Sequence, residues 1–424
     1  MDLIKTYGKY IKKNINNPSK TLNLLKFGFS FEKFLVSRFK DKKIPPSLNY
    51  LNELCVDFIL TPLKNPLNSA FVTIFSPVEI LYAMDMNPLL IEGFSSFLSG
   101  TQCEDAFIDC AEKSGISDTL CSYHKAFIGA VEAKAVPKPR FAITSSMICD
   151  SNLNTVRYIS GKYNIPYYYL DVPYEYSEYT VKYVVGQLHE IVEFIQDIMK
   201  TRFDEDKFKE VIRIENETKL YMRRFYKRLE HKYFPNTLTL EMYKLFTSHL
   251  GIGRPEVLDF YRMQAEDIEK YPDCRGKRIL WSHIMPFYSK TLKGRFNLNA
   301  DCQLLACDYN LDNLEEMDYN HPFEALAQKF LKNKLNGPFQ RKIQNIMKMA
   351  RNFNASGVIN LCSFGCKECS GGTMLLKEAL KRQDIPYLSI DGDGVDRRNA
   401  HEGQVETRVE AFMEILKSRQ KVEK

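Results

Sequence analysis

Hydrophobic positions recur along the chain with two different periods, and these predict two kinds of structure. From residue 3 to about residue 65 they follow helical spacing, as at Leu3, Tyr7 and Ile11, with a break at Pro45 and Pro46. From about residue 68, short apolar runs alternate with helical stretches, which is typical of parallel α/β structure. We therefore expect a helical N-terminal region followed by parallel sheets.

The apolar runs that predict strands fall into two groups, separated by a long helical segment with many charged residues. The expected strands are Ala70–Phe75, Phe141–Ser146, Pro166–Val172, Arg278–Trp281, Gln303–Ala306, Gly357–Leu361 and Tyr387–Ile390. A last amphipathic helix carries Val405, Val409, Phe412 and Leu416 on one face. The pattern predicts a helical N-terminal region (1–66), a first α/β domain (67–180), a helical connector (181–272) and a second α/β domain (273–424).

An internal repeat links the two α/β halves. The segment Gly161–Pro173 aligns with Lys381–Asp393, and each copy reads as a helix end, an Ile-Pro pair and a buried strand that finishes at an aspartate. Upstream of each copy a strand leads to a cysteine, Cys149 in the first and Cys366 in the second. Because ligands of open parallel sheets bind at the carboxyl ends of strands, we expect both cysteines at a cleft between the domains.

Composition places the chain among ordinary globular proteins. Of the 424 residues, 44% are hydrophobic and 26% are charged, which excludes disordered and fibrous classes. No apolar stretch is long enough to span a membrane, and the first five residues do not form the start of a signal peptide. We expect a cytoplasmic protein with no membrane partner.

The positive net charge is concentrated at one end of the chain. Residues 1–43 hold 11 lysines and arginines against 3 acidic residues, a net +8, whereas the whole chain carries +6 and the remainder therefore −2. No base-reading module is present, so nucleic acid is not expected as a partner. The basic segment is either a solvated helix face or a docking surface for an acidic protein.

Cysteine usage indicates metal or redox chemistry. The chain has 11 cysteines, more than a cytoplasmic protein needs for packing. The densest group is Cys362, Cys366 and Cys369, and Cys121 and Cys149 lie beside polar residues at expected strand ends or loops. Thiolates contributed by both domains predict an iron–sulfur cluster between them. No phosphate-binding glycine loop is present, so ATP hydrolysis is expected in a partner.

Several short motifs, taken in order, resemble the 2-hydroxyacyl-CoA dehydratase family, which includes benzoyl-CoA reductase subunits. They are Ser76–Ile80, Cys121–Lys125 with Gly129, Pro137–Pro139 with Cys149 and Asp150, Ile165–Pro173, and Gly403–Phe412. The resemblance is collinear from about residue 70 to residue 418. It implies two flavodoxin-like domains and a [4Fe–4S] cluster held by three cysteines, identified here as Cys121, Cys149 and Cys366.

The same resemblance leaves an alternative open. Cys362 and Cys369 are secondary candidates for the third ligand, and Cys103 and Cys307 add thiols beyond the three expected. Related proteins of the superfamily hold a double-cubane [8Fe–9S] cluster and reduce small molecules. A reductase of that kind, or a non-catalytic electron-transfer or partner subunit, therefore competes with the dehydratase.

Two residues are candidates for proton transfer. Ser76-Pro77-Val78-Glu79 has the pattern of a helix capping box, in which Glu79 reaches back to the first residue of the motif. The family resemblance implies instead that Glu79 faces the substrate and assists proton transfer. His124 is a second candidate, since an imidazole titrates near neutral pH.

The resemblance implies a complete reaction scheme. A separate ATP-hydrolysing iron–sulfur activator would deliver one electron at very low potential to a 2-hydroxyacyl-CoA thioester, whose ketyl radical anion then loses the hydroxyl group. The chain would be the iron–sulfur subunit of this radical lyase, in a homodimer or in a heterodimer with a homologous subunit.

Overall fold

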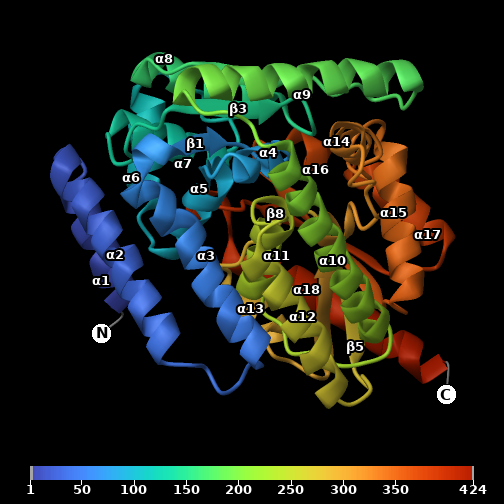
Figure 1. Cartoon of the computed structure of the whole chain (residues 1–424). Helices are drawn as coiled ribbons and strands as arrows, with labels where there is room; N and C mark the ends of the chain where they lie inside the picture. The colour runs from blue at the N-terminus through green and yellow to red at the C-terminus, as the bar shows by residue number, and fades with distance from the viewer. Residues whose placement is uncertain (1–2, 423–424) are drawn as a thin grey trace.

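The computed structural model describes residues 3–422, so residues 1–2 and 423–424, the outer ends of the expected terminal regions, lie outside the described residues. Figure 1 shows the chain running from a pair of helices at one side to a long C-terminal helix at the other. Between them lie two separate parallel sheets, each of four strands and each enclosed by helices. The expected α/β class with a helical N-terminus is confirmed.

Three helices form the N-terminal region. They are α1 (Leu3–Lys13), α2 (Pro18–Arg38) and α3 (Pro46–Lys64). The Asn17 side chain caps α2 by accepting a hydrogen bond from the Lys20 amide, and α3 begins at Pro46, as the proline break predicts. The expected apolar face of α1 is only partly covered, because Ile11 is buried whereas Leu3 is 77% exposed.

The first sheet has the strand order β2-β1-β3-β4, all parallel. Its strands are β1 (Ser69–Val72), β2 (Asn87–Leu90), β3 (Phe141–Ser145) and β4 (Tyr167–Leu170). The helices along it are α4 (Val78–Ala83), α5 (Ile91–Gly100), α6 (Glu104–Lys113), α7 (Ser122–Glu132) and α8 (Asp150–Tyr163). Buried residues dominate β1 and β3 because helices cover both faces of a parallel sheet.

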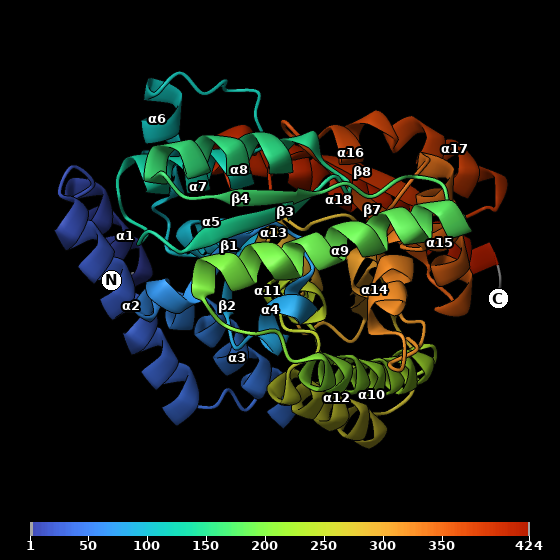
Figure 2. The ribbon, with the colours of Figure 1, turned by 45° about the horizontal axis from the view of Figure 1, so that its top comes forward.

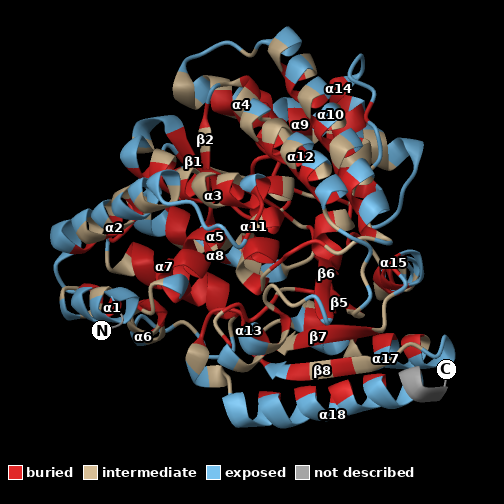
Figure 3. Cartoon of the chain, turned by 90° about the horizontal axis from the view of Figure 1, so that it is seen from below, coloured by how far each residue is buried: buried red, intermediate tan, exposed pale blue. Residues whose placement is uncertain are grey.

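The second sheet repeats this topology in the order β6-β5-β7-β8. Its strands are β5 (Lys277–Ser282), β6 (Cys302–Cys307), β7 (Gly357–Ser363) and β8 (Tyr387–Gly392). Its helices are α13 (Lys290–Phe296), α14 (Pro322–Leu331), α15 (Phe339–Asn352), α16 (Lys367–Gly371), α17 (Thr373–Arg382) and α18 (Glu402–Val422). Val405, Val409, Phe412 and Leu416 of α18 are buried, as its periodicity predicts, and Figure 3 shows the opposite face of that helix exposed.

Long helices connect the two sheets and pack beside both. They are α9 (Glu178–Met199), α10 (Glu205–Leu229), α11 (Leu238–His249) and α12 (Pro255–Asp267). Figure 2 shows α9 crossing in front of the first sheet toward α14 and α15. Short 3-10 helices complete the chain: η1 (Pro66–Asn68), η2 (Ile268–Lys270), η3 (Asp308–Leu311) and η4 (Arg397–Asn399).

One strand escapes the sequence analysis. The edge strand β2 has only four residues, contains Pro88, and runs without a break into α5. A proline is tolerated there because an edge strand needs hydrogen-bond partners on one side only. With no turn signal between strand and helix, the segment reads as one apolar run.

Within residues 3–422 we find no helix both long and apolar enough to cross a bilayer.

We predict that Gly129→Ala destabilises the packing of α7 against α6. A Cβ at this position would lie 1.7 Å from the carbonyl oxygen of Phe107, so the two helices would have to separate. Overpacking of this kind lowers the free energy of unfolding by about 1–3 kcal/mol. Thermal denaturation followed by circular dichroism measures the effect. Gly161→Ala is the matched control, since no atom lies within 4 Å of its Cβ position and the helix propensity of alanine then favours folding.

Candidate functional site

The carboxyl ends of the central strands position the candidate residues. In both sheets the chain leaves the two central strands in opposite directions, to β2 or β4 from the first and to β6 or β8 from the second. This divergence opens a crevice at the carboxyl edge of an α/β sheet. The loops after β1, β3, β5 and β7 therefore carry the residues most suited to chemistry.

Three of the expected cysteines occupy equivalent positions at the starts of helices. Cys121 is the N-cap residue of α7, Cys149 that of α8 and Cys366 that of α16. Ile148 and Gly365, which precede the last two, share the left-handed backbone conformation, with φ of +69° and +73°. The loops after β3 and β7 therefore repeat each other in conformation as well as in sequence.

A close backbone approach brings the second half of the chain onto the Cys121 loop. A Cβ on Gly365 would lie 2.7 Å from the Thr119 carbonyl oxygen and 2.9 Å from the Cys121 amide nitrogen. Only glycine combines this contact with a positive φ at low energy. Cys366 is thereby carried to the N-terminus of α7.

The thiols of Cys121, Cys149 and Cys366 lie close enough to interact electrostatically. Burial raises the pKa of Cys121 well above its usual range, and the neighbouring thiols of Cys366 and Cys149 raise it further. Burial also raises the pKa of Cys149. All 11 cysteines are free thiols, so none of these sulfurs is held in a disulfide.

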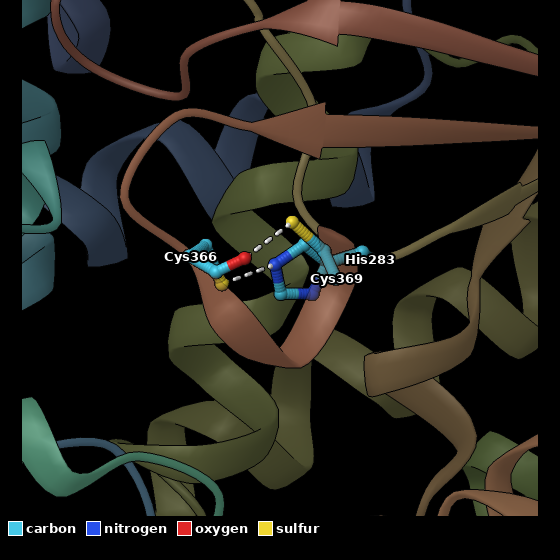
Figure 4. Close-up of side chains that lie close together, drawn as sticks. All are labelled: His283, Cys366 and Cys369. Atoms are coloured by element: carbon cyan, nitrogen blue, oxygen red, sulfur yellow. Dashed lines mark hydrogen bonds between the residues drawn. The ribbon is translucent and has the colours of Figure 1, made fainter. Parts of the chain in front are cut away.

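Cys366 lies beside a histidine that the sequence analysis missed. His283, which follows β5, has its Nε2 atom 3.3 Å from the Cys366 sulfur (Figure 4). Hydrogen bonding with Cys369 and contact with the His283 imidazole hold the pKa of Cys366 well below its usual range, against the effect of burial. Among residues 3–422, the ligand atoms of His283, Cys366 and Cys369 form the group of three that lies within single-ion range, all within 4.8 Å of one another.

A buried ion-pair network holds His283 in place. Its Nδ1 atom lies 3.3 Å from a carboxylate oxygen of Glu368, and Glu368 accepts hydrogen bonds from Lys342 at 2.9 and 3.0 Å. The His283 amide donates to Asp308 at 2.7 Å, and Tyr309 donates to Glu368 at 3.3 Å. The position of His283 directly after an expected strand is the sequence signal that could have identified it.

The additional cysteines differ in their surroundings. Cys369 is buried and accepts a hydrogen bond from the Ser363 amide at 3.0 Å, and the Cys307 thiol donates to the His283 carbonyl at 3.0 Å. Cys362 is half-buried on β7, where Asp391 and Thr373 are its polar neighbours. Cys103 lies elsewhere, within 3.1 Å of the Thr101 hydroxyl. Cys307 and Cys369 are thus near the Cys366 loop, whereas Cys103 is not.

Glu79 does not cap its helix, so the capping-box prediction is wrong. Helix α4 begins at Val78 with Pro77 as N-cap and no side-chain cap, and the Ser76 hydroxyl donates instead to the Ile143 carbonyl at 3.1 Å. Glu79 is 1% exposed and forms an ion pair with Lys329 of α14. The sequence separation of 250 residues explains why the local pattern could not reveal this partner.

His124 is buried in α7, three residues after Cys121. Burial lowers its pKa to about 4, so the imidazole is neutral at neutral pH, and its Nδ1 atom has no hydrogen-bond partner. A carboxylate that sequence reasoning missed lies near Cys149: Glu92 of α5 accepts hydrogen bonds from the Ile74 amide at 3.2 and 3.3 Å, and burial raises its pKa to about 7.

Two sheets of matching topology, with thiols gathered at their carboxyl edges, define a two-domain α/β protein with a cysteine-lined site. The family model described as "2-hydroxyglutaryl-CoA dehydratase, D-component" matches residues 73–416. The chain belongs to this family, which confirms the resemblance found in the sequence.

Curated relatives cover most of the chain at low identity. The (R)-phenyllactyl-CoA dehydratase alpha subunit of Clostridium sporogenes is 23% identical, covering 82% of this chain and 89% of its own length. The alpha subunit of lactoyl-CoA dehydratase from Anaerotignum propionicum is 22% identical over 81% of this chain and 89% of its own length. A benzoyl-CoA reductase subunit from Thauera aromatica is 22% identical, with coverages of 72% and 78%.

We predict that Cys366 is alkylated faster than Cys110 in the metal-free chain near pH 7. Both thiols are half-buried, but the pKa of Cys366 is lowered and burial raises that of Cys110, so Cys366 ionises more readily than Cys110. Labelling with iodoacetamide followed by peptide mass spectrometry should give a rate about tenfold higher for Cys366. His283→Phe should reduce that difference, and equal rates in the unmodified chain would contradict the assignment.

Proposed function

We propose that this chain is the iron–sulfur subunit of an ATP-activated, low-potential radical 2-hydroxyacyl-CoA dehydratase. The observation that carries the proposal is the convergence of Cys121, Cys149 and Cys366 from three helix N-termini. Membership of the dehydratase D-component family and the names of its relatives support it.

The donor set fits a [4Fe–4S] cluster. The three sulfurs interact electrostatically yet do not form a group within 4.8 Å among the described residues, so they suit a cluster better than a single ion. Each thiol belongs to the residue that precedes a helix, and metal binding would require the buried thiols of Cys121 and Cys149 to give up the protons that burial favours. When bound, such a cluster supplies an electron at low potential to the thioester carbonyl.

The chain's own residues would perform the remaining tasks. The loops after β3 and β7 carry Cys149 and Cys366, and the loop between α6 and α7 carries Cys121. Glu79 is the candidate for moving the proton, because it is buried at the carboxyl end of β1 with one carboxylate oxygen unpartnered. His124 is neutral near pH 7 and is therefore a candidate proton acceptor.

A double-cubane [8Fe–9S] reductase is the second candidate function. The observation that favours it is the presence of Cys307 and Cys369 next to His283 and Cys366. A larger cluster needs more protein contacts, and these two buried thiols could supply them. The relatives named as alpha subunits support a complex with a homologous subunit for either function.

We predict that Cys121→Ala, Cys149→Ala and Cys366→Ala each abolish the brown chromophore and the activity of anaerobically purified protein. A missing thiolate opens a ligand position that the other two thiols cannot fill. Iron and acid-labile sulfide analysis measures the loss.

Cys302→Ala is the matched control, since this buried thiol lies near Met413 and outside the group. Full iron content in the Cys149 variant would contradict the proposed ligand set. The same analysis separates the two candidates, because about four irons per chain support the dehydratase and about eight support the double cubane.

We also propose that α2 docks the ATP-hydrolysing activator. Phe27, Phe31 and Phe34 lie at helical spacing on α2 and are 65%, 51% and 55% exposed, and the first two rings stack at 6.2 Å. The surrounding segment 1–43 carries a net charge of +8. An aromatic stripe within a basic surface suits an acidic protein partner, because charge steers the encounter and apolar contact stabilises the complex.

The double variant Lys20→Glu/Arg38→Glu should slow activator-dependent reduction about tenfold at low salt. Reversing two exposed charges of α2 weakens electrostatic steering, so the rate should also lose part of its salt dependence. Stopped-flow spectroscopy with the activator and ATP measures the rate. Lys182→Glu/Lys417→Glu, on α9 and α18, makes the same change in net charge elsewhere. Identical rates for the two double variants at all salt concentrations would disprove docking through α2.

A further inference from the structure

Four charged residues, three of them buried, meet beside the carboxyl end of β1. Lys329 of α14 forms ion pairs with Glu79 of α4 and, at 2.8 Å, with Glu215 of α10. Glu215 is also paired with Lys219 of the same helix at 2.8 Å. Glu79, Glu215 and Lys219 are at most 1% exposed. Two carboxylates and two ammonium groups thus share one desolvated cluster, which we call the Glu79 cluster.

The Glu79 cluster lines a small cavity of about 20 Å³, with room for about one water molecule and with further polar walls. The lining residues besides the cluster include Ser248, His249, Asn310, Asp312 and Asn333. One oxygen of Glu79 has no hydrogen-bond partner although it is fully buried. A buried acceptor without a partner carries a large desolvation penalty, so it marks a place that a ligand, water or proton can occupy.

A series of packed aromatic side chains connects the cavity to the thiol site. Phe75, which follows β1, lines the cavity, and its ring lies 6.4 Å from that of Tyr309. The Tyr309 ring lies 5.2 Å from that of His283, whose Nε2 atom contacts Cys366. Glu79 is therefore at the same edge of the crevice as the thiols without touching them.

A second hollow lies on the other side of Lys329. A cleft of about 250 Å³ shares Lys329, Asp312 and Asn313 with the cavity, and its outer wall includes the exposed residues Asp318 and Lys332. Lys329 therefore lines both the inner cavity and the outer cleft.

The two carboxyl groups of the Glu79 cluster are inequivalent. Burial raises the pKa of Glu79, Lys329 lowers it and Glu215 raises it further. Glu215 contacts two ammonium groups, Lys219 and Lys329, which lower its pKa to about 2 in spite of burial. Paired groups whose environments separate their pKa values in this way are a mark of acid–base sites.

Charged and titratable side chains on the neighbouring elements surround Glu79. Helix α10 presents Glu215 and Lys219, α14 presents Lys329, and α11 presents His249, whose Nε2 atom lies 3.1 Å from Asp312 after η3. Tyr82 of α4 interacts with Arg254, the residue that precedes α12. Among these groups, Lys329 and Glu215 make the largest charge contributions to the pKa of Glu79.

We propose that Glu215, Lys329 and Lys219 are positioning residues that tune the proton affinity of Glu79, so that Glu79 alone exchanges a proton with the occupant of the cavity. The proton-transfer role rests on the proposed dehydratase function. In that reaction the bond between carbon 2 and the hydroxyl oxygen breaks, and the departing hydroxide takes the proton of the Glu79 carboxyl group to leave as water. The Glu79 carboxylate then takes the proton of the β carbon while the electron pair of that C–H bond forms the new C=C bond, both transfers relayed by the water that the cavity can hold, so Glu79 ends in its starting state.

The test measures the titration of the Glu79 carboxyl group directly. Infrared difference spectroscopy of the anaerobically purified full-length chain follows the protonated carboxyl band that is absent in Glu79→Gln. Glu215→Gln removes a neighbouring negative charge of similar shape, so the midpoint of this band should move down by about 1–3 pH units. Lys329→Met removes a positive charge, so the midpoint should move up by a similar amount.

A second variant keeps the test decisive if Lys329→Met does not fold, because Lys329→Met leaves the buried Glu79 carboxylate without its ion-pair partner. Lys219→Met removes a cation of the cluster that does not contact Glu79, and it should also move the midpoint up. Lys244→Met, which removes a buried lysine paired with Glu241, is the matched control and should leave the midpoint unchanged.

Opposite shifts in the glutamine and methionine variants support the proposal, because loss of packing alone would not reverse sign with charge. Equal midpoints, shifts in one common direction, or the absence of any Glu79 band above the ordinary range of a glutamate overturn it. In active enzyme, the corresponding limb of the kcat/KM profile should move with the band. If the infrared shifts appear in a chain without dehydratase activity, the proposed function fails and the tuning of Glu79 stands.

Discussion

The contact between Gly365 and the backbone of the Cys121 loop is the constraint on which the candidate site depends. The loop after β7 crosses onto the start of α7 with no room for a side chain, and its left-handed conformation turns Cys366 toward that helix. A polar contact of the same two regions reinforces this, since the Ser122 hydroxyl donates to Asp393 after β8. Each half of the chain contributes sulfur to the site, so neither sheet could build it alone.

Desolvation governs the rest of the chemistry. Burial raises the pKa of Cys121 and of Glu79 and lowers that of His124, and each departure is opposed or extended by a specific neighbour. Removing one member of a buried ion pair costs about 3–5 kcal/mol because an uncompensated charge remains. The Glu79–Lys329–Glu215 arrangement is therefore a demanding feature to maintain, and it lines a cavity of about 20 Å³.

The internal repeat is an example of a feature that local sequence patterns predicted correctly. Cys149 and Cys366 follow corresponding strands, as the alignment of the two segments predicted, and the structure shows that both are also helix N-cap residues. Glu79 shows the opposite case. Its Ser-Pro-Val-Glu pattern predicted a helix cap, but the cap is absent, because an ion pair with a lysine 250 residues away captures the carboxylate. A helix-capping pattern spans only four residues, so it could not reveal that Lys329 would pair with the Glu79 carboxylate.

The amino-acid sequence by itself determined the α/β class, seven of the eight strands, the α18 face and the family, because periodicity and motif order are local and collinear. It also predicted which cysteines could act together, through the repeat. Only the tertiary structure decided the partners of those residues: His283 beside Cys366, Lys329 between Glu79 and Glu215, and the Gly365 contact with the Cys121 loop. Charge pairing and desolvation depend on distances between segments far apart in the chain, and those distances exist only after the two sheets have packed together.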